Sequence, residues 1–271
     1  MKIAFLGGGN MAGALIGGLL AKGYAPGSLS VVEVLLQVRE SLATRYKVHL
    51  SAAPDEATFA ADTLLLAVKP QDMRQAVAPF KGRLKGQLVI SIAAGIRLED
   101  LSRWLGGYKR LVRVMPNTPA LIGAGVAGLY ASPEVSPDER ARAEGILGAV
   151  GTTVWVADEA LIDPVTAVSG SGPAYVFYFI ESLERAGVEL GLTPETARSL
   201  AIQTFTGAAR LAAESADPPS VLRERVTSKG GTTEAALKVF ASEDIAGRIG
   251  LGLKAASERG VELGRLLGKD G

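Results

Sequence analysis

The chain has 271 residues and a nearly balanced charge, with 29 Lys and Arg against 28 Asp and Glu. Its 48% hydrophobic and 21% charged residues are typical of a globular protein, long enough to bury a sizeable core in one or two domains. The balanced charge lacks the basic excess of a nucleic-acid-binding protein. The absence of Cys excludes disulfides and thiolate nucleophiles, and the single His argues against His-rich metal sites and a hydrolase triad. We therefore expect no metal site and no nucleic-acid partner.

An uncharged stretch near the start, residues 3–21, can be mistaken for a signal peptide or a membrane span. The run Gly7–Asn10 interrupts it after a few apolar residues. That apolar run is too short for a signal peptide, and the Gly-rich break would place polar backbone in lipid. We expect no membrane segment and a cytoplasmic location.

The first part of the chain alternates short apolar runs with helical patterns. The expected strands are residues 2–6, 29–34, 63–68, 87–92, 110–115, 125–130 and 153–156. The expected helices are residues 11–22, 35–45, 71–80, 98–105 and 137–150. Strands made of continuous Val, Ile and Leu indicate burial on both faces, as in a parallel sheet. The alternation predicts a doubly wound α/β domain with a mostly parallel sheet over residues 1–157.

After about residue 158 the pattern becomes helical only. The expected helices are residues 173–192, 194–215, 220–226, 233–240 and 245–267, separated by Gly, Pro or Ser-Asp. We predict an all-helical second domain over residues 158–271, with no low-complexity linker before it. The apolar positions of Tyr175–Phe179 exceed what one helix face needs. They pack either in the core of this domain or against a second subunit.

The segment that follows the first expected strand, residues 7–12, matches the motif G-x-G-x-x-A at the start of a helix. Gly7 permits the tight turn, Gly9 lets the backbone approach a pyrophosphate, and Ala12 allows close helix-strand packing. The helix N-terminus favours negative charge. A Gly-rich turn without a ligand is the alternative, but the strand-helix context predicts a Rossmann dinucleotide site.

The choice between NADH and NADPH depends on Glu33, at the end of the second expected strand. A carboxylate there accepts hydrogen bonds from the adenosine ribose hydroxyls and repels a 2′-phosphate, which favours NADH. Arg39, six residues on, can turn toward a phosphate instead. Glu33 can also be a solvated strand end, so the preference stays open.

Further candidate residues stand at strand ends and helix starts. The chain has only two Asn, and Asn117 lies within Met115–Pro119, directly after an expected strand. There it either contacts a ligand or caps a Pro-bounded loop. Two segments, Ser169–Tyr175 and Thr227–Thr233, place hydroxyl groups and Gly at helix starts. Free backbone N–H groups at such positions bind a carboxylate or phosphate, or are simply capped.

Several short motifs follow one another along the chain: residues 7–12, Ala67–Gln71, Ala93–Gly95, Met115–Pro119, Leu161–Asp163, Ser169–Tyr175 and Thr227–Thr233. In this order and spacing they resemble the pyrroline-5-carboxylate reductase family over essentially the whole chain, and the last motif is specific to it. The resemblance implies reduction of Δ1-pyrroline-5-carboxylate to L-proline with NAD(P)H, the last step of proline biosynthesis. It also implies an N-terminal Rossmann domain and a helical C-terminal domain that dimerises by interleaving helices. In several members the dimers assemble into rings.

The resemblance also implies most of the site residues. Gly7 and Glu33 are added from the residues themselves, Gly7 from the G-x-G-x-x-A motif and Glu33 from its place at the end of the second expected strand. The cofactor-binding residues are Gly7, Gly8, Gly9, Asn10, Met11, Glu33, Ala67, Val68, Lys69, Pro70, Ala94 and Asn117. The substrate-binding residues are Glu159, Gly231, Thr232 and Thr233. The Thr233 hydroxyl is the candidate for a hydrogen bond to the ring nitrogen, which makes it the catalytic candidate. Lys69 can alternatively be a solvated strand end. Members that prefer NADPH usually carry Ser, Thr, Asn or Arg where this chain has Val32–Leu35, which puts NADPH preference in doubt.

Two other functions share parts of this pattern. A β-hydroxyacid dehydrogenase-like reductase also has a Rossmann domain followed by helices, but it carries a catalytic Lys on the first long helix of the second domain. Ser169–Ile180 contains no Lys. A non-catalytic NAD(P)-sensing protein would keep the Gly turn, but it would have no use for a substrate segment at Gly230–Thr233. Turnover of an imine substrate separates these alternatives.

Overall fold

The computed structural model describes residues 1–269 and divides into two compact units. The first unit comprises residues 1–171 together with the chain from Ala255 onward, and the second is Gly172–Lys254. The first unit therefore runs past residue 157, the predicted domain boundary, and includes the end of the last helix. The final two residues of the predicted helical domain, 270 and 271, lie outside the described residues.

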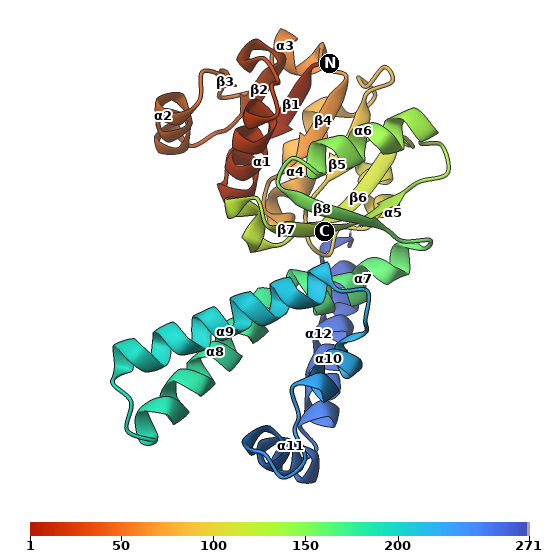
Figure 1. The fold of residues 1–271 in the computed structure, drawn as a ribbon. Helices are drawn as coiled ribbons and strands as arrows, with labels where there is room; N and C mark the ends of the chain where they lie inside the picture. The colour runs from red at the N-terminus through yellow and green to blue at the C-terminus, as the bar shows by residue number, and fades with distance from the viewer. Residues whose placement is uncertain (270–271) are drawn as a thin grey trace. The chain divides into compact units, whose positions relative to one another are not determined.

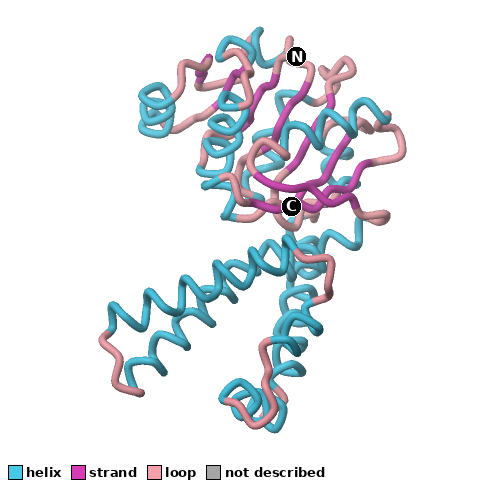
Figure 2. Tube along the Cα trace, viewed as in Figure 1, coloured by secondary structure: helices cyan, strands magenta, loops and turns pink. Residues whose placement is uncertain are grey.

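The first unit is built on one sheet of eight strands in the order β3-β2-β1-β4-β5-β6-β7-β8 (Figures 1 and 2). All neighbouring strands pair in parallel except β6 and β7, which are antiparallel. The mostly parallel Rossmann sheet predicted from the sequence is confirmed. The strands are β1 Ile3–Leu6, β2 Leu29–Val32, β3 His49–Ser51, β4 Thr63–Leu66, β5 Leu88–Ser91, β6 Leu111–Met115, β7 Gly125–Ala131 and β8 Gly151–Trp155.

Helices cover both faces of this sheet. They are α1 Asn10–Ala21, α2 Leu36–Arg45, α3 Glu56–Phe59, α4 Met73–Val77, α5 Leu98–Trp104 and α6 Pro137–Leu147. Alternate side chains of one strand enter opposite cores. Ile3 and Phe5 of β1 pack with residues of α1 and α6, whereas Ala4 and Leu6 pack with residues of α4 and α5. Burial on both faces is the reason that the strands read as continuous apolar runs.

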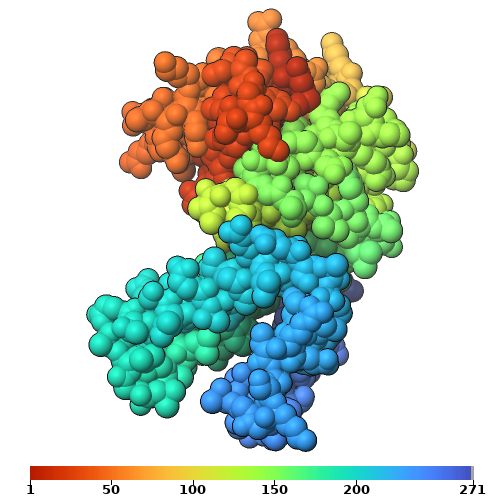
Figure 3. Space-filling model, in the orientation of Figure 1, coloured from red at the N-terminus to blue at the C-terminus, as the bar shows by residue number. Residues whose placement is uncertain are grey.

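The chain is helical from Glu159 onward, as predicted. Short turns at Glu159–Leu161, α7 (Ile162–Val165) and a π-helix (Thr166–Gly170) lead into the long helices. These are α8 Gly172–Glu189, α9 Pro194–Glu214, α10 Pro219–Arg225, α11 Thr232–Ser242 and α12 Ile245–Leu267. Helices α8 and α9 pack side by side as a helical hairpin, whose surface Figure 3 shows in green and cyan. No described helix is both long and apolar enough to span a membrane.

Several short elements differ from the sequence-based expectation, and three of them belong to the sheet domain. The strand β3 and the helix α3 were not predicted, because segments of three and four residues show no hydrophobic period. The helix expected over residues 71–80 is a 3₁₀ turn, the short α4 and a second 3₁₀ turn. Pro79 lacks an amide hydrogen and crowds the preceding turn, so α4 ends at Val77.

Candidate active site

The predicted cofactor residues all follow the carboxyl ends of neighbouring parallel strands. Gly7–Met11 follow β1, Glu33 follows β2, Ala67–Pro70 follow β4, Ala94 follows β5 and Asn117 follows β6. Strands β2, β1, β4, β5 and β6 are adjacent and parallel, so these segments share one edge of the sheet. The strand order reverses direction between β1 and β4, and open α/β sheets bind ligands at such a point.

The glycines of the β1–α1 turn meet different constraints. Gly7 has φ +99°, and a Cβ there would lie 2.7 Å from the carbonyl oxygen of Ala67. A Cβ at Gly9 would meet nothing within 4 Å, although Gly9 is the N-cap of α1 and offers no side-chain cap. The amino end of α1 is therefore open and uncapped. It fits the pyrophosphate of a dinucleotide, because free N–H groups and the helix dipole favour an anion there.

The Glu33 carboxylate is held by two backbone amides. The Gly8 N–H donates to Oε2 at 2.8 Å, and the Leu35 N–H donates to Oε1 at 2.8 Å. The Arg39 guanidinium donates to the backbone carbonyl of Glu33 at 2.5 Å. The negative charge is thus fixed beside the Gly turn, and the arginine that could meet a phosphate is bonded to the backbone instead.

The predicted residues after β4, β5 and β6 differ in exposure. Ala67, Val68, Pro70 and Ala94 are half-buried, and Lys69 is exposed. The Asn117 side chain is buried and bonded at both ends. Its Nδ2 donates to the carbonyl of Ser169 at 3.1 Å, and its Oδ1 accepts from the Val126 N–H at 2.9 Å. Asn117 therefore holds its own loop against β7 and the π-helix, whatever it contributes to a ligand.

The half-buried carboxylate of Glu159 belongs to a charge cluster with the buried Arg113 and Asp163, which sequence reasoning missed. Oε1 of Glu159 accepts from the Leu98 N–H at 2.8 Å and from the Arg113 guanidinium at 3.2 Å. Arg113 also donates to Asp163 at 3.2 Å, and it is only 2% exposed. The signal was available in the sequence, because Arg113 is a single charge inside the apolar strand Leu111–Met115.

The other predicted substrate residues lie in the second unit, at the start of α11. Gly230 has φ +74°, and Gly231 is the N-cap of α11 without a side-chain cap. Thr232 is exposed and Thr233 is half-buried, both on the first turn. The structure brings Gly231, Thr232 and Thr233 together at the start of α11, and a helix N-terminus suits a carboxylate. The Gly231 N–H already donates to the carbonyl of Ser228 at 3.0 Å, and the Gly230 N–H donates to Glu234 Oε2 at 2.7 Å.

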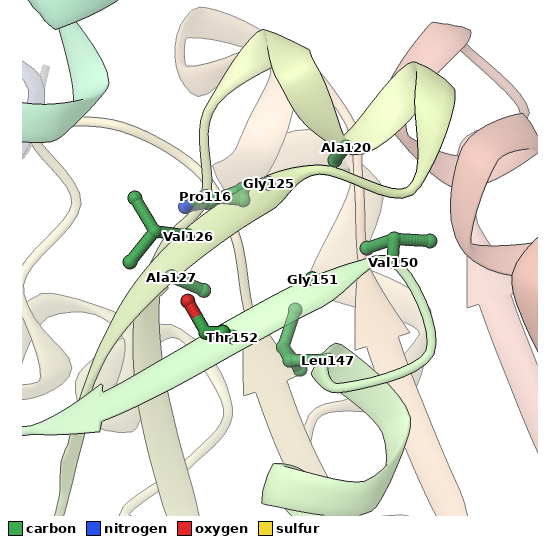
Figure 4. Close-up of a pocket in the computed structure, with 9 residues that line it drawn as sticks. All are labelled: Pro116, Ala120, Gly125, Val126, Ala127, Leu147, Val150, Gly151 and Thr152. Carbon is green, nitrogen blue, oxygen red and sulfur yellow. The ribbon is translucent and has the colours of Figure 1, made fainter. Parts of the chain in front are cut away.

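A small apolar hollow near β7 and β8 contains none of the predicted site residues (Figure 4). Its empty volume of about 170 Å³ is below the range of ordinary small-molecule sites. The lining residues are Pro116, Ala120, Gly125, Val126, Ala127, Leu147, Val150, Gly151 and Thr152. Only Thr152 among them offers a side-chain hydroxyl, so the hollow lacks the polar groups that orient a ligand.

Two family models match the chain. The model described as "Pyrroline-5-carboxylate reductase dimerisation" matches residues 159–263, and the one described as "NADP oxidoreductase coenzyme F420-dependent" matches residues 2–95. A pyrroline-5-carboxylate reductase of Pseudomonas aeruginosa is 46% identical over 269 residues, covering 99% of this chain and 98% of the relative.

Solved structures agree with these matches. A pyrroline-5-carboxylate reductase from Coxiella burnetii has a TM-score of 0.92 at 41% identity, covering 97% of this chain and 98% of that chain. A pyrroline carboxylate reductase from Plasmodium falciparum with NADP bound has a TM-score of 0.85 at 28% identity, with the same coverage. The identities of 46% and 41% over nearly the full length exclude the β-hydroxyacid dehydrogenase-like alternative. The chain belongs to the pyrroline-5-carboxylate reductase family.

Proposed function

We propose that this protein reduces the cyclic imine Δ1-pyrroline-5-carboxylate to L-proline with NAD(P)H, the last step of proline biosynthesis. The observation that carries this function is the 46% identity to a pyrroline-5-carboxylate reductase over 99% of the chain. The protein self-associates through its helical domain as a dimer, and the dimers can assemble into a ring. It acts in the cytoplasm on a small-molecule substrate.

In this proposal the sheet edge after β1, β4, β5 and β6 binds the cofactor. Gly7 forms the turn, and the backbone N–H groups of Gly9, Asn10 and Met11 approach the pyrophosphate, with Gly8 beside them. Support comes from the uncapped start of α1 and from the free space over Gly9. The segment Ala67–Pro70, including Val68 and Lys69, lines the nicotinamide-ribose side together with Ala94 and Asn117.

The chemistry suits a chain with one His and no Cys. Bound NAD(P)H supplies a hydride to C5 of the imine, and the ring nitrogen carries a proton. In the protonated imine the carbon is already electrophilic, so no strong general acid is needed. The protein has to orient the substrate: Gly231, Thr232 and Thr233 hold its carboxylate through backbone N–H groups, and the Thr233 hydroxyl forms a hydrogen bond with the ring nitrogen. In this role the Gly231 N–H turns from the Ser228 carbonyl, to which it donates in this structure, toward the substrate.

The cofactor preference in this proposal follows from Glu33. Its carboxylate is held beside the Gly turn, where it can accept hydrogen bonds from the adenosine ribose and repel a 2′-phosphate. Arg39 is bonded to the backbone of Glu33, which leaves it less able to pair with a phosphate. We propose that the enzyme accepts both cofactors and turns over faster with NADH.

Initial rates of the purified protein with pyrroline-5-carboxylate, measured in parallel with NADH and NADPH, test the proposal. Faster turnover with NADH would support both the reaction and the role of Glu33. Faster turnover with NADPH would keep the reaction and discard the role of Glu33. Binding of either cofactor without any turnover would favour the non-catalytic NAD(P)-sensing alternative.

A further inference from the structure

The guanidinium of Arg113 joins separate segments of the first unit. Arg113 lies in β6, and its side chain is 3% exposed. It pairs with Glu159 and with Asp163, each at 3.2 Å, and both acids lie on the segment that follows β8. A buried charge is stable only when it is paired and hydrogen-bonded. The two carboxylates are therefore held to β6 by the same guanidinium.

Glu159 also links Arg113 to the start of α5. The Oε1 atom that accepts from Arg113 also accepts the N–H of Leu98, the first residue of α5, at 2.8 Å. Arg97, the N-cap of α5, supplies no side-chain cap. A carboxylate from elsewhere in the chain thus takes the capping position, and it also suits the positive end of the helix dipole.

The loop between β5 and α5, Ile92–Arg97, contacts the end of α12 on another side. A Cβ at Gly264 would lie 3.2 Å from the carbonyl oxygen of Gly95. Gly95 has φ +77°, and a Cβ there would lie 3.2 Å from Leu267 Cδ1. Helix and loop meet backbone to backbone, so the loop has little room to shift while its end at Leu98 is held by Glu159.

We propose that Arg113 is a positioning residue for the reduction: it holds Glu159 on the Leu98 amide and thereby fixes the loop that carries Ala94. The proposal rests on the proposed function, in which Ala94 lines the nicotinamide-ribose side. Asp163 completes the pairing of the guanidinium. Displacement of a bound reactant by about 1 Å can cost on the order of 100-fold in rate, so a loosened loop lowers turnover.

The test compares Arg113→Met and Arg113→Lys with Arg110→Met. Arg110 precedes the same strand and pairs with Glu139 at 3.4 Å, but it is half exposed and lies outside this cluster. The measurements are kcat and KM, the affinity for ADP-ribose, which lacks the nicotinamide, and hydrogen exchange of a peptide spanning residues 93–101.

Arg113→Met should lower kcat by about ten- to a hundredfold and leave ADP-ribose affinity unchanged, because the Gly turn and Glu33 are untouched. Exchange should accelerate in residues 93–101 and stay unchanged in the Gly turn and α1. Arg113→Lys keeps the charge but not the planar fork, so it should restore part of kcat and of the protection. Arg110→Met should match the wild type throughout.

Wild-type kinetics in Arg113→Met would overturn the proposal. Faster exchange spread evenly over the whole sheet would also overturn it, because Arg113 would then act only on overall stability. If Arg113→Met does not fold, Arg113→Lys is measured instead. A wild-type exchange rate at Leu98 together with a wild-type kcat in Arg113→Lys would then contradict the proposal. Failure of the wild type to reduce pyrroline-5-carboxylate would overturn the proposed function, whereas the exchange data would still decide whether Arg113 holds the loop.

Discussion

At the scale of single residues, Gly7 and Gly9 belong to one motif but respond differently to substitution. The space over Gly9 is open, so Gly9→Val should leave thermal stability nearly unchanged and abolish NADH binding by filling the approach to the pyrophosphate. Gly7→Ala should instead destabilise the fold by about 1–3 kcal/mol, because of its positive φ and the contact with Ala67. Thermal unfolding and NADH titration of the two variants check this contrast. Normal NADH affinity in Gly9→Val would contradict the proposed pyrophosphate site.

Thr233 carries the catalytic prediction. Because Gly231, and not Thr233, is the N-cap of α11, Thr233→Ala should leave the helix start intact. Loss of a positioned hydrogen bond to the ring nitrogen should lower kcat by about ten- to a thousandfold. Steady-state kinetics with pyrroline-5-carboxylate measure the effect, and Thr233→Ser, which keeps the hydroxyl, is the matched control. Unchanged turnover in Thr233→Ala would remove the residue from the mechanism.

Glu33 carries the prediction on cofactor choice. Glu33→Gln keeps an oxygen that accepts from one of the two backbone amides and removes the negative charge. The ratio of kcat/KM for NADPH over NADH should rise by about ten- to a hundredfold, since ribose loses a charged acceptor and the 2′-phosphate loses a repelling neighbour. Parallel rates with the two cofactors measure the ratio. A ratio equal to that of the wild type would show that Glu33 does not select the cofactor.

The predictability of single residues depended on how local their signal was. The Gly turn and the start of α11 follow from neighbouring residues in sequence, so both could be located before the structure. The partners of Glu159 could not, because Leu98 and Arg113 reach it only through the sheet topology. The two bonds of Asn117 to Val126 and Ser169 were hidden for the same reason.

At the scale of elements, the periodicity of hydrophobic residues predicted the long strands and helices but not the short ones. The helix over Ile245–Leu267 has the predicted bounds, because its apolar face repeats over many turns. The strands that were expected end within a few residues of their predicted ends, since an apolar run can continue past the last backbone hydrogen bond of a strand. Strand β3 and helix α3 are specified by tertiary pairing and by a cap, which no period reveals.

The cap of α3 gives a prediction on pH. Asp55 accepts from the Thr58 N–H and faces His49 at 2.6 Å. Burial acts to raise the pKa of Asp55, but the hydrogen bonds from His49 and Thr58 outweigh it and lower the pKa from 3.8 to about 2. A carboxyl with a depressed folded-state pKa stabilises the fold above its unfolded value, and this contribution is lost as the pH falls from about 4 to about 2.

Asp55→Asn tests this contribution, because Asn keeps the N-cap hydrogen bond and removes the charge. The loss of unfolding free energy between pH 5 and pH 2, measured by urea denaturation, should be smaller in the variant by about 1 kcal/mol, after allowance for solvent screening of a partly exposed group. Equal pH dependence in the two proteins would mean that the His49–Asp55 pair contributes nothing.

At the scale of the whole molecule, the helical domain exposes apolar side chains that one chain alone leaves in water. Phe177 and Tyr178 of α8 are 66% and 63% exposed. They lie in the stretch whose surplus of apolar residues was compatible either with packing against a second subunit or with a core inside this domain. The matched model named for dimerisation spans this helix. Exposed aromatic side chains of this size are typical anchors of a stable protein–protein interface.

Phe177→Glu should therefore shift the protein from dimer to monomer, because a buried, unpaired carboxylate costs several kcal/mol at an interface. Ile122→Glu is the matched control: Ile122 is 83% exposed but lies in the first unit, between β6 and β7, outside the matched dimerisation segment. Sedimentation equilibrium of the two variants gives the masses. A Phe177→Glu protein that keeps the wild-type mass would place the interface elsewhere. A monomeric Ile122→Glu protein would mean that the first unit also contributes to self-association.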